Sequence, residues 1–130
     1  GAGLGASARS ALLARAFSEL TRIVTAMGGS ASTLTGLAGL GDLTLTCTSM
    51  QSRNYRFGLA LGRGLSAVEV GASGIGLAEG VATAPVARSL ARELDIDAPL
   101  VGAVNQVLEG SAAIGEIVAG LMSRPLKRED

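Results

Sequence analysis

The chain has few of the side chains on which most catalytic and metal sites depend. Its 130 residues include no histidine, one cysteine, one lysine and three aromatic residues. Without histidine and with a single cysteine, it cannot form a zinc site of the usual Cys and His kind, a disulfide framework or a nucleophile activated by histidine. All other cationic side chains are arginine, so lysine chemistry has one candidate, Lys127.

The charge balance and the apolar runs exclude further classes. Eleven basic residues offset eleven acidic ones, which argues against a nucleic-acid-binding domain with its usual basic excess. No apolar run approaches the roughly 18 residues of a membrane span. The first five residues lack the basic region and apolar core of a secretory signal. The lone Cys47 suits a reducing compartment, and we expect a cytoplasmic protein.

Alanine, leucine and glycine dominate the composition of the chain. The chain contains 22 Ala, 19 Leu and 19 Gly, and 48% of it is hydrophobic. Ala and Leu favour helix, and the length suits one domain with a core of its own. We therefore expect an all-α fold, with six to eight helices in one compact domain spanning residues 1–130.

The first helix is the clearest prediction. Apolar residues at spacings of three and four between residues 7 and 27 indicate one apolar helix face, with Ser7 as the expected cap. Arg15, Glu19 and Arg22 are spaced to pair on its exposed side. A short helix that starts at Ser32 and ends at Gly39 is expected within residues 30–41, and further helices over residues 52–62, 66–70, 81–94, 100–109 and 111–121. Their expected caps and ends include Ser52, a capping box of Ser66 with Glu69, Gly110 and Ser111.

Two segments are ambiguous or irregular. Residues 43–48 alternate between apolar and polar side chains, which is typical of a strand, whereas Asp42 after Gly41 is a typical helix start. Residues 71–80 hold four glycines and are expected to form an extended loop. Their spacing is not that of the dinucleotide-binding fingerprint, and no strand clearly precedes them.

Two clusters of polar residues could bind a ligand. Ser52, Arg53 and Asn54 stand at an expected helix start, where free N–H groups and a partial positive charge attract anions. Arginine adds a two-pronged donor suited to phosphate. Asp42 and Thr46 lie one turn apart if their segment is helical, and could hold sugar-like hydroxyls. The alternative is ordinary helix capping with an exposed arginine.

The same residues carry a resemblance to a known family. The runs 38–48 and 51–58 are similar to the substrate domain of bacterial NAD(P)-dependent glycerol-3-phosphate dehydrogenase. Residues 5–12, 78–81 and 121–127 resemble further segments of that domain in the same order, so the resemblance covers essentially the whole chain.

The resemblance implies a fold and a set of roles. The fold would be the all-helical C-terminal domain related to that of 6-phosphogluconate dehydrogenase, with Asp42 capping a helix. Glycerol 3-phosphate or dihydroxyacetone phosphate would be bound by Asp42, Thr46, Ser52, Arg53 and Asn54. The cofactor, NAD or NADP, would contact Arg53, Leu77 and Glu79. No metal is implied, and the complete enzyme would be a homodimer that supplies glycerophospholipid synthesis.

The chain also departs from the family pattern. The family's Rossmann domain and its catalytic lysine precede the matched region, and Lys127 matches no catalytic position. Ser7 replaces the asparagine that the family usually has. We therefore expect the chain alone to be inactive, as the substrate-binding part of a longer enzyme. Two alternatives are a non-catalytic helical interaction or dimerisation module, and a related dehydrogenase with another phosphorylated or acidic substrate.

Overall fold

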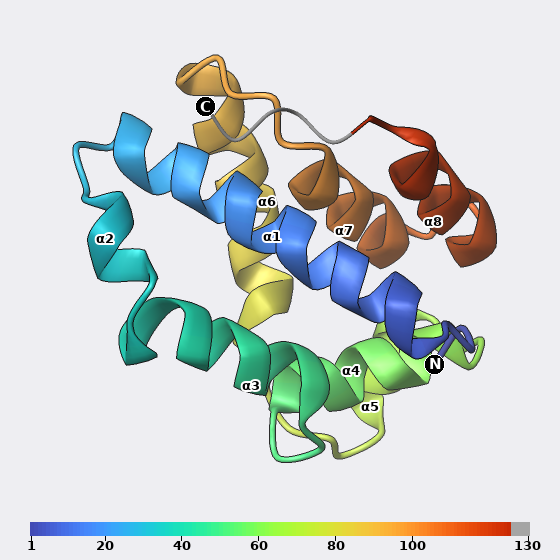
Figure 1. Ribbon diagram of the computed structural model, residues 1–130. Helices are drawn as coiled ribbons and strands as arrows, with labels where there is room; N and C mark the ends of the chain where they lie inside the picture. The colour runs from blue at the N-terminus through green and yellow to red at the C-terminus, as the bar shows by residue number, and fades with distance from the viewer. Residues whose placement is uncertain (126–130) are drawn as a thin grey trace.

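The structure, a computed structural model that describes residues 1–125, confirms the all-α prediction. Within that range the chain forms eight α-helices and one π-helical segment, with no strand (Figure 1). These elements are α1 (Ala6–Ala26), α2 (Ala31–Leu34), η1 (Leu37–Gly41), α3 (Asp42–Thr48), α4 (Arg53–Gly62), α5 (Ala67–Ala72), α6 (Glu79–Glu93), α7 (Pro99–Glu109) and α8 (Ile114–Ser123). Lys127 lies outside the described residues.

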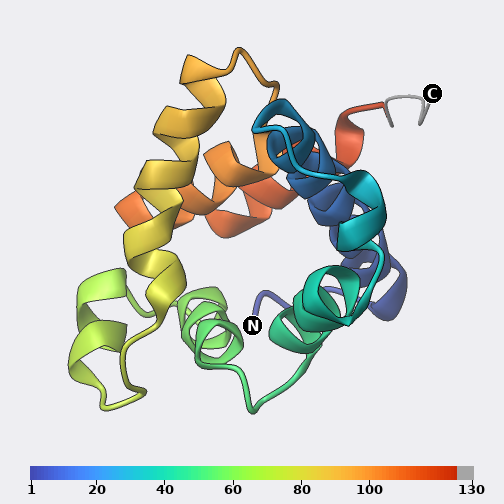
Figure 2. The ribbon, with the colours of Figure 1, turned by 90° about the vertical axis from the view of Figure 1, so that its left-hand side faces the viewer.

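The long helix α1 crosses one side of the molecule, between α7 and α3 (Figure 1). It contacts α7 at one end of the fold and α3 at the other. Helix α6 packs against α7 and also contacts α4, and α7 in turn packs against α8. Viewed from the side, α1, α3, α4 and α6 are arranged around the middle of the molecule (Figure 2). The starts of α4 and α6 are therefore brought to the same end of the domain as α3.

Two small apolar clusters hold these helices together. Phe57, Leu61, Val70 and Ala78 form the first, between α4, α5 and the start of α6, and Val107 packs against it. Ala103, Ile117 and Leu121 form the second, between α7 and α8. Val107 packs against this cluster too, so α7 links both. None of the helices in the described part of the chain has the length and apolar character needed to cross a membrane.

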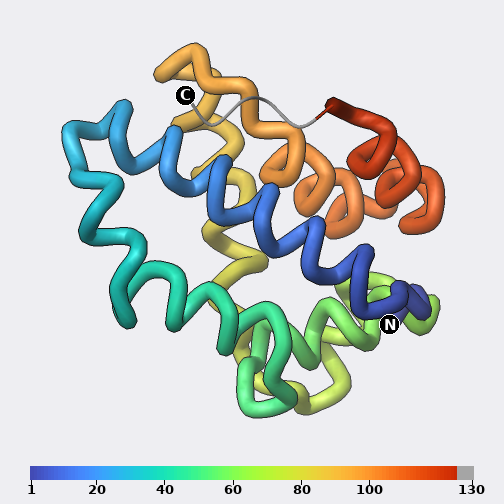
Figure 3. Tube along the Cα trace, viewed as in Figure 1, coloured from blue at the N-terminus to red at the C-terminus, as the bar shows by residue number. Residues whose placement is uncertain are grey.

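The ambiguous residues 43–48 are helical and belong to α3. The π-helical segment η1 runs directly into α3 (Figure 3), because Gly41 keeps helical dihedral angles of φ −62° and ψ −50°. Asp42 is thus the first residue of α3. The resemblance had implied that Asp42 caps this helix, and that expectation is wrong. A side chain at Gly39 would overlap the Leu34 carbonyl oxygen. Glycine is therefore required where the wide turn packs against α2.

The predicted helix ends are partly correct. Ser52 caps α4, and Ser66 with Glu69 forms the capping box of α5. Gly110 ends α7 in the left-handed conformation, with φ 65°, as glycine commonly does. The predicted caps of the first and last helices are wrong: Gly5 precedes α1 and Ala113 precedes α8, and neither makes a side-chain cap.

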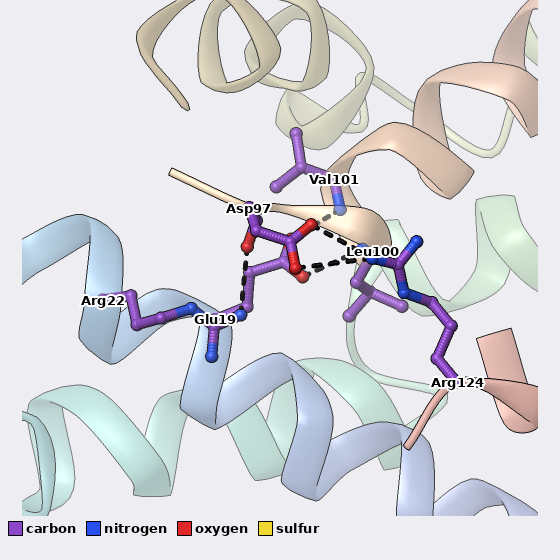
Figure 4. A network of polar contacts seen from close by, with 6 residues as sticks. All are labelled: Glu19, Arg22, Asp97, Leu100, Val101 and Arg124. Atoms are coloured by element: carbon purple, nitrogen blue, oxygen red, sulfur yellow. Dashed lines mark hydrogen bonds and ion pairs between the residues drawn. The ribbon is translucent and has the colours of Figure 1, made fainter. Parts of the chain in front are cut away.

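Glu19 was expected on an exposed face, but only 3% of it is exposed. Its carboxylate accepts hydrogen bonds from the backbone N–H groups of Leu100, at 2.9 Å, and Val101, at 2.7 Å (Figure 4). Helix α7 has no side-chain cap of its own. A carboxylate at a helix start satisfies free N–H groups and interacts favourably with the helix dipole, so Glu19 caps α7 from a distant helix.

Arginines surround this junction. Arg22 donates a hydrogen bond to the Asp97 carbonyl oxygen, and Arg124 forms an ion pair with the Asp97 carboxylate at 3.2 Å (Figure 4). Arg22 also donates to the Ser18 hydroxyl. Arg15 donates to the carbonyl oxygen of Arg124. These contacts hold α1, the α6–α7 connection and the end of α8 together. We therefore assign this cluster to the stability of the fold.

Candidate functional site

A hollow of about 360 Å³ lies where α3 meets the starts of α4 and α6. It is lined by Leu45, Thr46, Gln51, Ser52, Arg53, Asn54 and Glu79. Five of the seven predicted site residues therefore gather around one space, although three separate helices supply them. Gln51 also lines it and was not among the predicted residues, despite its place directly before Ser52.

Ser52 is positioned by its role as the cap of α4. Its backbone is extended, with φ −72° and ψ 127°, and its hydroxyl oxygen accepts the Tyr55 N–H at 3.2 Å. A serine hydroxyl can still donate its own hydrogen while it accepts one bond. Ser52 can therefore offer a donor to a ligand oxygen without losing the cap.

Arg53 and Glu79 face each other across the hollow. Their closest charged atoms, Nη2 and Oε1, lie 4.0 Å apart, and the side chains are 55% and 78% exposed. Exposed ion pairs of this kind contribute little to stability. The guanidinium of Arg53 can therefore exchange this weak contact for an anionic ligand at small cost.

Arg53 is also packed against the loop that precedes α6. A side-chain atom added at Gly76 would lie 3.7 Å from Cδ of Arg53. Gly76 has a φ of 88°, a left-handed conformation that glycine adopts without strain. The loop can thus turn closely beside the arginine stem.

Asn54 connects two of the elements that line the hollow. Its Oδ1 accepts a hydrogen bond from the backbone N–H of Gly80, 26 residues later, at 3.0 Å. Asn54 is the second residue of α4 and Gly80 the second residue of α6. The bond therefore joins two helix starts, each of which carries free N–H groups and a partial positive charge.

The other two predicted residues lie near the hollow without lining it. Asp42 is exposed at the start of α3, one turn before Thr46. Leu77 is 73% exposed in the loop that leads into α6, two residues before Glu79. Their side chains can reach only a ligand that extends beyond the hollow itself.

An apolar groove of about 410 Å³ adjoins this site and shares Thr46 and Asn54 with it. Its lining also includes Cys47, Tyr55 and Phe57. Cys47 is exposed at the surface, but desolvation by neighbouring atoms raises the pKa of its thiol. A raised pKa keeps the thiol protonated near neutral pH, which disfavours a nucleophilic role.

The donors in the hollow outnumber the acceptors. Arg53, the amides of Gln51 and Asn54 and the hydroxyls of Thr46 and Ser52 can supply hydrogens, while the Glu79 carboxylate and the Gln51 amide oxygen can accept them. Within residues 1–125 no group of three Cys, Asp or Glu side chains is placed to hold a metal ion. The arrangement suits a small anion with several oxygen atoms, such as a phosphate monoester.

Comparisons with known proteins point to one family. The family described as "NAD-dependent glycerol-3-phosphate dehydrogenase C-terminus" matches residues 1–119. Two curated relatives are both named "Glycerol-3-phosphate dehydrogenase [NAD(P)+]". The protein from Caulobacter vibrioides is 50% identical over 99% of this chain and 39% of its own length, and the one from Brucella ovis is 53% identical over 100% and 38%.

A solved structure has the same fold. The crystal structure of glycerol-3-phosphate dehydrogenase from Coxiella burnetii aligns with a TM-score of 0.90 and 42% sequence identity. The alignment covers 95% of this chain and 38% of that one. The chain therefore spans about two fifths of the length of the relatives it matches.

Proposed function

Since the chain belongs to the family of NAD-dependent glycerol-3-phosphate dehydrogenase C-terminal domains, we propose that it is the substrate-binding part of such an enzyme. The enzyme would interconvert sn-glycerol 3-phosphate and dihydroxyacetone phosphate with NAD or NADP. The observation that carries this proposal is the gathering of Thr46, Ser52, Arg53, Asn54 and Glu79 around one hollow.

The phosphate would lie at the start of α4. Arg53 would place its two-pronged guanidinium against the phosphate oxygens, while Ser52 and Asn54 donate single hydrogen bonds. These contacts are remote from the reacting carbon. Their binding energy can nevertheless serve catalysis, because it holds the rest of the substrate in a reactive position.

The three-carbon end of the substrate would extend from the hollow towards α3. Thr46 would lie beside the reacting carbon 2, and Asp42, one turn away, would accept hydrogen bonds from the substrate hydroxyls. An extended substrate fits the geometry because Asp42 does not line the hollow itself. Mutation of either residue should then affect the reacting end more than phosphate capture.

The residues at the opposite rim fit the edge of a nicotinamide cofactor. Glu79 could accept a hydrogen bond from a cofactor hydroxyl or amide, and Leu77 and Arg53 lie beside it. The bound cofactor would supply the hydride that moves to or from carbon 2. The chain itself would hold and orient the substrate, and the proton would come from a lysine of the dinucleotide-binding domain, as in the family.

The wider setting of this activity is part of the same proposal. The complete enzyme would pair this domain with its Rossmann domain, act as a homodimer in the cytoplasm and supply glycerol 3-phosphate for glycerophospholipid synthesis. The family resemblance supports these features.

A chimeric enzyme tests the proposed function. The matching region of the Caulobacter vibrioides relative is replaced by this chain, and reduction of dihydroxyacetone phosphate is followed with NADH and with NADPH. We expect activity in the chimera, and an Arg53→Ala change to lower kcat/KM by about 100-fold through lost phosphate capture. Arg92→Ala, at an exposed arginine of α6, is the matched control. A folded but inactive chimera, or unchanged activity after Arg53→Ala, contradicts the proposal.

A further inference from the structure

The hydrogen bond between Asn54 and Gly80 constrains both residues. The backbone N–H of Gly80 can only donate, so the Asn54 atom 3.0 Å away must be the acceptor Oδ1. The amide of Asn54 is planar, so this bond also fixes the position of its Nδ2 group, which lies 3.8 Å from a Cβ atom built at Gly80. Because Oδ1 already receives the Gly80 N–H, the amide offers a ligand chiefly the two N–H donors of Nδ2.

The Asn54 side chain leaves little room for a side chain at Gly80. A Cβ atom added at Gly80 would lie 2.9 Å from Oδ1 and 3.3 Å from Cγ of Asn54. The first distance is closer than a real Cβ contact, and all three of its nearest neighbours are atoms of the Asn54 amide. The backbone of Gly80 is not left-handed, so its own conformation does not require glycine.

We propose that Gly80 is a positioning residue that acts through Asn54. It lets the start of α6 approach the start of α4 closely enough to fix the Asn54 amide in one orientation. The fixed amide then keeps its Nδ2 donors available to a ligand in the hollow, beside the guanidinium of Arg53. This arrangement selects a ligand end made of acceptors alone, such as a phosphate, over one that carries hydroxyl donors. The inference rests on the proposed function, because it assigns the phosphate end of the substrate to this position.

The weak contact between Arg53 and Glu79 supports this assignment. Glu79 is the carboxylate among the residues that line the hollow, and it lies 4.0 Å from the guanidinium. The acceptor oxygen of the Asn54 amide already receives the Gly80 N–H, so this amide contributes chiefly its Nδ2 donors. A phosphate bound at the start of α4 would therefore meet donors from Arg53, Asn54 and Ser52.

A double-mutant cycle on the 130-residue chain tests whether Gly80 acts through Asn54. Gly80→Ala, Asn54→Ala and the double variant are compared for affinity to glycerol 3-phosphate and for thermal stability. We expect Gly80→Ala alone to weaken binding by about 10-fold, the equivalent of one misplaced hydrogen bond. In the Asn54→Ala background, where the Cβ meets no amide, we expect the same change to alter affinity less than about 2-fold.

Two further variants separate positioning from folding. Gly71→Ala is a matched control, because a Cβ at this helical glycine meets nothing within 4 Å. Asn54→Asp keeps an acceptor for the Gly80 N–H but removes the donors, so we expect normal stability and a loss of phosphate binding. A Gly80→Ala variant that binds like the original chain, or equal effects of Gly80→Ala in both backgrounds, overturns the inference.

Failure of the proposed function has a different signature. If the original chain binds neither glycerol 3-phosphate nor inorganic phosphate, the proposed function is contradicted. The melting temperatures of the original chain, the two single variants and the double variant then still test whether Gly80 and Asn54 are coupled. A non-additive change in melting temperature supports their coupling, and additive changes overturn it.

Discussion

The carboxylate of Glu19 in α1 accepts the backbone N–H of Leu100, 81 residues later, at 2.9 Å. A second N–H, from Val101, completes the cap of α7. A residue on the longest helix thus satisfies the start of another helix, and the link helps to hold α7 at the centre of the fold. The same helix α7 packs against α6, whose first turn lines the proposed site.

Removal of the Glu19 carboxylate should destabilise the domain. Glu19→Ala leaves two part-buried N–H groups without their acceptor, so we expect the free energy of unfolding to fall by about 2–4 kcal/mol. Glu19→Gln keeps one acceptor oxygen and should lose roughly half as much. Urea unfolding followed by circular dichroism measures both. Glu93→Ala, at an exposed residue of α6, is the control, and an equal effect of Glu93→Ala and Glu19→Ala contradicts the assigned cap.

The wide turn before α3 should depend on Gly39. A Cβ there would overlap the Leu34 carbonyl oxygen and lie 2.6 Å from its carbonyl carbon, so we expect Gly39→Ala to cost about 3 kcal/mol or more in stability. Gly58→Ala in α4 meets nothing within 4 Å and should be neutral or stabilising by up to about 1 kcal/mol. Thermal unfolding compares the two variants. Equal melting temperatures would show that the π-helical segment tolerates a side chain at position 39.

The capping box of α5 should make stability depend on pH. The hydrogen bond from the Ser66 backbone N–H lowers the pKa of Glu69 most, the bond from the Ser66 hydroxyl lowers it further, and desolvation opposes them. A lowered folded-state pKa stabilises the fold above the unfolded-state value, and the contribution is lost as the pH falls through the folded-state value. The difference in stability between the original chain and Glu69→Gln should therefore shrink below about pH 4. A difference that stays constant from pH 7 to pH 3 contradicts this role of Glu69.

The purified 130-residue chain should show no dehydrogenase activity by itself. It has no histidine and one lysine, Lys127, and the family resemblance implies that the catalytic lysine lies on the dinucleotide-binding domain. Dihydroxyacetone phosphate is assayed with NADH and with NADPH by the absorbance of the reduced cofactor, with the Coxiella burnetii enzyme as the positive control. Robust turnover by the chain alone would show that it supplies its own proton donor and cofactor site.

The sequence predicts local features of this fold better than distant contacts. Ser52, the Ser66–Glu69 box and Gly110 were predictable, because a cap acts within a few residues of the helix end that it satisfies. Glu19 was not, because its partners are 81 and 82 residues away and its neighbours Arg15 and Arg22 suggest an exposed ion-pair face. The alternation of residues 43–48 suggested a strand, but packing against α4 and the continuous helical path through Gly41 make the segment helical.

The candidate site was predictable in part for the same reason. Ser52, Arg53 and Asn54 are adjacent in sequence at a helix start, so their convergence needs no knowledge of the fold. That Glu79 joins them, and that Gly80 holds Asn54, depends on how α6 packs against α4. Such a relationship between residues 26 positions apart is visible only in three dimensions.

The most direct test of the central claim is a titration of the ¹⁵N-labelled chain with glycerol 3-phosphate, followed by two-dimensional NMR. We expect saturable shifts in the backbone signals of Thr46, residues 52–54 and residues 79–80. Glycerol at the same concentration should cause none, because it lacks the phosphate that Arg53 would hold. Arg53→Ala should abolish the shifts and Arg92→Ala should preserve them. Shifts that are absent, lie elsewhere or are equal for glycerol would contradict a phosphate-binding site at the start of α4.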